Sequence, residues 1–107
     1  MNHTVMESAL GETIRRIVRT AHPRRILLFG SAARGEMGPD SDLDLLVVVA
    51  AGQHRRKTAQ EIYKNLVGVG FASDVVVVTE SDVAEYRENP GTVISSALRE
   101  GRPVYGA

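Results

Sequence analysis

The chain has 107 residues, 43% apolar and 24% charged, which predicts one small globular domain over residues 1–107. Its 13 basic and 13 acidic residues cancel, so no strong nucleic-acid footprint is expected. The absence of cysteine excludes disulfides and thiolate metal sites. No apolar run approaches the roughly 20 residues of a membrane span, and no signal-peptide pattern opens the chain, so we expect a cytoplasmic protein.

The first part of the chain predicts a helix and two strands. Apolar residues recur at helical spacing from Glu7 to Thr20, and His22-Pro23 ends the pattern. The arginines between those apolar residues are expected on a solvated face. A strand over 26–29 follows, and a second strand over 42–50 is apolar enough to be covered on both faces.

The rest of the chain alternates between helical and strand patterns. We expect a helix over 55–67, a strand over 71–79, helices over 81–88 and 92–100, and an extended tail over 102–105. Ser81-Asp82 is expected to cap the first of the two late helices, and Val93 is expected to point inward from the second. This order predicts an α/β (α+β) fold, with a small mixed β-sheet and flanking helices.

Two aspartates stand at the start of the second predicted strand. Asp42 and Asp44 are two residues apart, so their side chains should project to the same face. Two carboxylates this close repel each other, and a cation between them would relieve that repulsion. Hard cations such as Mg²⁺ prefer oxygen ligands, so the pair predicts a magnesium site.

A glycine–serine turn precedes these aspartates. Gly30-Ser31 follows the first predicted strand, and the helix-forming run 32–34 comes next. Free backbone N–H groups at such a helix start bind phosphate, and glycine lets the backbone approach the ligand closely. A phosphate-binding turn facing metal carboxylates predicts phosphoryl or nucleotidyl transfer.

Two other phosphate or metal motifs fail on spacing. Asp40, Asp42 and Asp44 match the first ligands of an EF-hand loop, but Leu45 and Ala51 stand where that loop needs Gly and Glu. The stretch from Gly30 to Gly38 lacks the Lys-Ser or Lys-Thr of a Walker loop.

The combined motif resembles that of a known superfamily. Gly30-Ser31-x-Ala33-Arg34-Gly35, followed by Ser41-Asp42-x-Asp44-Leu45, is similar to the signature of the DNA polymerase β-type nucleotidyltransferases. It resembles most the minimal nucleotidyltransferases, which include MntA-type antitoxins paired with HEPN-domain toxins. The close resemblance runs from Arg24 to Thr79 and implies the polymerase β-like nucleotidyltransferase fold.

The resemblance implies a role for each residue of the motif. Asp42 and Asp44 would hold two Mg²⁺ ions, and Asp74, next to a four-valine run, would be the third carboxylate, as ligand or general base. Gly30 and Ser31 would bind the terminal phosphates of ATP. Arg34 would stabilise phosphate charge or form a salt bridge. Ser41 would cap the turn that orients Asp42.

The acceptor is expected to come from another chain, because nothing in these 107 residues is long enough to be an acceptor-binding domain. The resemblance implies AMP transfer from ATP to a tyrosine hydroxyl of a HEPN-type toxin. Three alternatives stay open: transfer to a small molecule such as an aminoglycoside, a non-catalytic antitoxin that blocks its toxin by occlusion, and a generic α/β domain in which the aspartate pair has no function.

Overall fold

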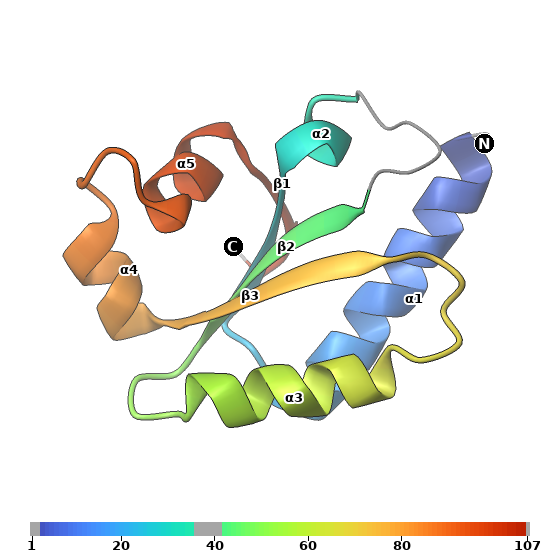
Figure 1. The fold of residues 1–107 in the computed structure, drawn as a ribbon, viewed down its shortest axis with the longest axis horizontal. Helices are drawn as coiled ribbons and strands as arrows, with labels where there is room; N and C mark the ends of the chain where they lie inside the picture. Colours follow the sequence, from blue (N-terminus) through green and yellow to red (C-terminus); the bar gives the residue numbers. More distant parts are fainter. Residues whose placement is uncertain (1–2, 36–41, 107) are drawn as a thin grey trace.

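The computed structural model describes residues 3–35 and 42–106. In chain order the elements are α1 (His3–Ala21), β1 (Arg25–Phe29), α2 (Gly30–Ala33), β2 (Leu43–Val49), α3 (Arg55–Asn65), β3 (Ser73–Thr79), α4 (Glu80–Tyr86), α5 (Val93–Glu100) and β4 (Arg102–Tyr105). The strands form one sheet in the order β3-β2-β1-β4, of which Figure 1 labels β3, β2 and β1. β1 runs antiparallel to β2 and β4, whereas β2 and β3 are parallel, which confirms the predicted mixed sheet with flanking helices.

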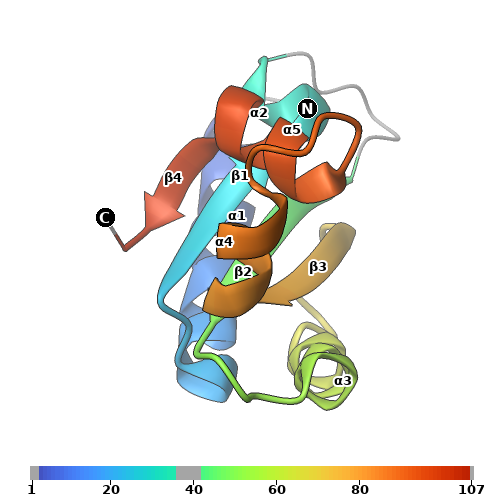
Figure 2. The same cartoon turned by 90° about the vertical axis from the view of Figure 1, so that its left-hand side faces the viewer.

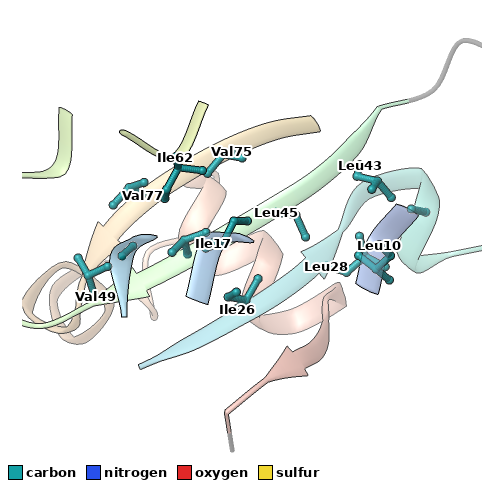
Figure 3. Packing of buried hydrophobic residues seen from close by; sticks show 13 residues of the cluster. Leu10, Ile17, Ile26, Leu28, Leu43, Leu45, Val49, Ile62, Val75 and Val77 are labelled. Atoms are coloured by element: carbon teal, nitrogen blue, oxygen red, sulfur yellow. The ribbon is translucent and has the colours of Figure 1, made fainter. Parts of the chain in front are cut away.

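The larger core cluster lies between the sheet and the helices α1 and α3. Every second residue of β2, from Leu43 to Val49, points into this cluster (Figure 3). Ile17 from α1 and Ile62 from α3 meet these side chains and are fully buried. The alternate residues of β2 therefore build one continuous apolar layer on this face.

The helices α4 and α5 cover the opposite face of the sheet. Figure 2 shows them in front of the strands, with α1 behind. Leu46 and Val48 of β2 pack there against Val83 of α4 and Ile94 of α5, in a smaller cluster. The same face carries Asp44 at the start of β2, beyond the part of the sheet that the cluster occupies.

The caps of α4 and α5 correct two expectations. Thr79, not Ser81-Asp82, is the N-cap of α4: its hydroxyl accepts from the Asp82 N–H (3.1 Å), and the Asp82 carboxylate accepts from the Thr79 N–H (2.9 Å). This reciprocal pair satisfies two backbone donors at once, so the helix begins one residue earlier than Ser81. Val93, expected inward, is 43% exposed, because it is the first residue of α5.

One arginine expected on a solvated face has a structural role. The Arg16 guanidinium donates to the carbonyl oxygens of Asn65 and Val67, at 3.2 and 2.9 Å, and pairs with Glu12 at 2.9 Å. Carbonyls at a helix C-terminus lack intrahelical partners, so Arg16 ties the end of α3 to α1. Arg19 is exposed, as predicted.

The two outer strands of the sheet differ. On β3, the Val75 N–H donates to the Tyr63 hydroxyl at 2.7 Å, so α3 closes part of that edge. The predicted extended tail is β4, which pairs with β1. Within residues 3–35 and 42–106, no helix is both long enough and apolar enough to cross a bilayer.

Candidate functional site

Asp44 and Asp74 lie opposite each other at one end of the sheet, with Asp42 close by. β2 and β3 run in parallel with Asp44 opposite Asp74, and residues opposite each other in neighbouring strands point to the same face. The Leu43 N–H donates to the Ala72 oxygen at 2.9 Å, which holds the two strand starts level. Asp42 lies just before β2, two residues ahead of Asp44, and its negative charge also reaches Asp44.

The nearby negative charges affect the pKa of Asp44. Its carboxyl is half-buried, and its pKa is raised above the ordinary value, first by burial, then by the negative charge of Asp74 and then by that of Asp42. The positive charge of Arg34 opposes this rise in the pKa. A cation near Asp44 would offset the negative charge that its two neighbouring carboxylates add.

The glycine–serine turn packs directly against Asp44. Gly30 has φ +71°, a conformation that favours glycine, and a Cβ placed there would overlap Oδ2 of Asp44 and lie 3.1 Å from its Cγ. Phe29, the residue before the turn, is the strand partner of Asp44. Glycine at position 30 thus allows the backbone of the turn to lie against the carboxylate.

The structure brings most of the predicted site residues to this end of the sheet. Gly30 and Ser31 open α2, and Arg34 is its C-terminal cap. Ser41 lies outside the described residues. Sequence reasoning missed Phe29, whose position opposite Asp44 puts it on the same face of the sheet; the alternation along β1 was the available signal.

The donor set fits Mg²⁺ bound together with a substrate. Within the described ranges 3–35 and 42–106, no group of three or more acidic or histidine side chains forms a ready-made metal cage. Mg²⁺ seldom uses such cages: it takes one or two carboxylates and completes its shell with substrate phosphates and water. The charge crowded around Asp44, all of it on oxygen donors, meets that requirement.

Strand-end carboxylates beside a glycine–serine turn are the groups that nucleotidyl or phosphoryl transfer requires. Residues 12–104 match the family model of the nucleotidyltransferase domain. The chain therefore belongs to the nucleotidyltransferase family, and the predicted minimal nucleotidyltransferase is confirmed.

Solved structures show the same fold. A putative nucleotidyltransferase from Sulfolobus solfataricus superposes with a TM-score of 0.54 at 20% identity, over 79% of this chain and 82% of that one. A chain from a toxin-antitoxin structure with AMP-PNP gives a TM-score of 0.54 at 24% identity, over 89% of this chain and 72% of that one. No curated protein matches the sequence.

Proposed function

We propose that this nucleotidyltransferase moves AMP from ATP to an acceptor hydroxyl in a Mg²⁺-dependent reaction. The observation that carries the proposal is the strand register that sets Asp44 beside Asp74, against the backbone of Gly30. Carboxylates supply the metal ligands of such a reaction, and the turn supplies the phosphate site.

The three carboxylates have different roles in the proposed reaction. Asp42 and Asp44 would hold the divalent metal, which when bound would supply charge neutralisation at the triphosphate and a lower pKa for the acceptor hydroxyl; two Mg²⁺ ions are proposed. Asp74 is exposed, so it is accessible to an incoming acceptor as general base or further ligand. The acceptor oxygen forms a bond to the α-phosphorus, the bond from that phosphorus to the bridging oxygen breaks, pyrophosphate leaves with the electron pair, and Asp74 takes the proton.

The turn and α2 hold the terminal phosphates. Phe29, the N-cap residue of α2, makes no side-chain cap hydrogen bond, so no cap side chain occupies the first backbone N–H groups of α2. Gly30 lets a phosphate approach that backbone, and the Ser31 hydroxyl adds a donor. Arg34 is positioned to balance phosphate charge, since its field already reaches Asp44. The capping role of Ser41 stays a prediction.

The acceptor we propose is a tyrosine of a HEPN-type toxin, with this chain as its antitoxin. Support comes from the motif resemblance and from the toxin-antitoxin structure with AMP-PNP among the fold neighbours. AMP on the toxin would block it.

The decisive experiment incubates the protein with labelled ATP, Mg²⁺ and the product of the neighbouring gene. Label on a tyrosine of that product supports the proposal. Asp42→Asn should abolish labelling, whereas Glu85→Gln, an exposed acidic residue on α4, should leave it unchanged. Toxin neutralised equally by wild type and Asp42→Asn, without label, would establish occlusion instead.

A thermal-shift measurement separates catalysis from occlusion without the partner. A nucleotide site that binds ATP with Mg²⁺ raises the melting temperature by mass action, by an amount that grows with ligand concentration. The proposal expects a shift with ATP and Mg²⁺ together that is absent in Asp42→Asn. A small-molecule transferase would give the same shift, but would label an added aminoglycoside rather than the toxin.

A further inference from the structure

A second charged cavity lies at the opposite end of the sheet. We call it the arginine pocket: about 450 Å³, lined by Arg24 and Arg25 at the start of β1, Glu80 and Arg87 at the two ends of α4, and Val48 and Val83 between them. α4 crosses the sheet at this end (Figure 2). None of these residues has a role in the reaction described above.

The pocket is separate from the carboxylates. Arg25 pairs with Val48 at one end of the β1–β2 ladder, and Phe29 pairs with Asp44 at the other. Four residues of extended chain span about 13 Å. A ligand in the arginine pocket would therefore leave the carboxylate end free.

The charge of the pocket is not balanced. Its three guanidiniums and one carboxylate give a formal charge of +2. Arg24 Nε lies 3.7 Å from Glu80 Oε1, with 63% and 51% of the two side chains exposed, which makes a weak and easily displaced pair. Among the described residues, neither Arg25 nor Arg87 forms an ion pair. Guanidinium groups gathered without counter-charges bind anions.

We propose that the arginine pocket binds a phosphate monoester of a small organic molecule. Such a group carries a charge near −2 at neutral pH, which matches the +2 of the lining. Guanidinium forks hold phosphate through paired hydrogen bonds. The volume falls in the range of small-molecule sites, roughly 300–1,000 Å³, so it accommodates more than the phosphate itself. Ala84, an exposed residue of the lining on α4, offers apolar surface to the organic part.

Calorimetric titration with ribose 5-phosphate tests the proposal. It is done at constant ionic strength in EDTA, because the metal-free carboxylates at the other end of the sheet then repel an anion. Wild type should bind, and ribose without phosphate should not. Arg87→Gln should weaken binding at least tenfold, since it removes a charged donor from an exposed position that the fold does not need. Glu80→Gln should tighten binding, since it raises the charge of the lining by one.

The control is the variant Arg19→Gln. Arg19 is an exposed arginine on α1, which packs against the opposite face of the sheet, so this variant should bind like wild type. Three results would overturn the proposal: no binding by wild type, equal weakening in Arg19→Gln and Arg87→Gln, or loss in Arg34→Gln rather than in Arg87→Gln. The last result would place the ligand at the carboxylate end. None of these results depends on nucleotidyl transfer, so the proposed function stands or falls separately.

Discussion

The two faces of the sheet are built for different tasks. Beneath α1 and α3, the core cluster is continuous, with Ile17, Leu45 and Ile62 fully buried. Beneath α4 and α5, the apolar cluster is smaller, and charged groups stand at both ends of the strands: carboxylates where β2 begins, arginines where it ends. β2 serves both faces, since Leu43 and Leu45 enter the core while Asp44 between them enters the site. The larger apolar core thus lies on one face, and the candidate site and the arginine pocket lie on the other.

Asp44→Asn should produce the largest functional effect. The loss of a metal carboxylate should reduce AMP transfer at least about a hundredfold, or about 2.7 kcal/mol of transition-state stabilisation. Stability should stay equal or rise, because one of three crowded charges disappears. Transfer rates and urea denaturation of the same preparation measure both quantities. Wild-type turnover in this variant would refute the assignment of Asp44.

Ile62→Ala should lower stability without affecting nucleotide binding. It removes a fully buried side chain from the core face, so a loss of about 2–5 kcal/mol of unfolding free energy is expected. Val67→Ala is the matched control: that side chain is 78% exposed, and the change should stay within about 0.5 kcal/mol. Mg²⁺–ATP binding per folded molecule should be unchanged in both variants. A loss of binding in folded Ile62→Ala would show that the faces are not independent.

Gly30→Ala probes the contact between the turn and Asp44. An alanine there is strained at φ +71° and overlaps the carboxylate, so a loss of about 1–3 kcal/mol and weaker Mg²⁺–ATP binding are expected. Gly52→Ala isolates the strain, because Gly52 has φ +89° and its added methyl meets nothing within 4 Å. Denaturation and thermal shift compare the two. Equal effects on nucleotide binding would mean that the contact with Asp44 does not matter.

The pH dependence of stability should show the smallest effect. The folded-state pKa of Asp44 is raised above its ordinary value of 3.8, so ionising this carboxyl costs folding free energy. Relative to Asp44→Asn, wild type should lose stability as the pH rises from 3.8 through the raised pKa, and the difference should then level off. Below 3.8 the two proteins should differ little in this respect. Urea denaturation of both proteins without metal, from pH 3 to 7, measures this difference in unfolding free energy. If the difference shrinks as the pH rises, burial and neighbouring charge are not the cause of the raised pKa.

The local part of the site could be predicted from the chain alone. Gly30-Ser31 follows a strand because the apolar run ends there, and the shared face of Asp42 and Asp44 stays a prediction from strand alternation. The helices and strands were predicted near their observed bounds for the same reason: hydrophobic periodicity is local. The family that residues 12–104 match was predicted from the resemblance of the Gly30-Ser31 and Asp42-x-Asp44 motif to a known signature, not from periodicity.

Only the tertiary structure shows which residues from distant segments lie in contact. Asp74 lies opposite Asp44 because β2 and β3 pair in parallel and in register, and the carboxylate of Asp44 fits against Gly30 because β1 pairs with β2. The tether from Arg16 to the end of α3 and the gathering of Arg24 and Arg87 in one pocket arise in the same way. Spacing along a chain sets the direction of a side chain, whereas hydrogen bonding and packing between segments set which side chains meet.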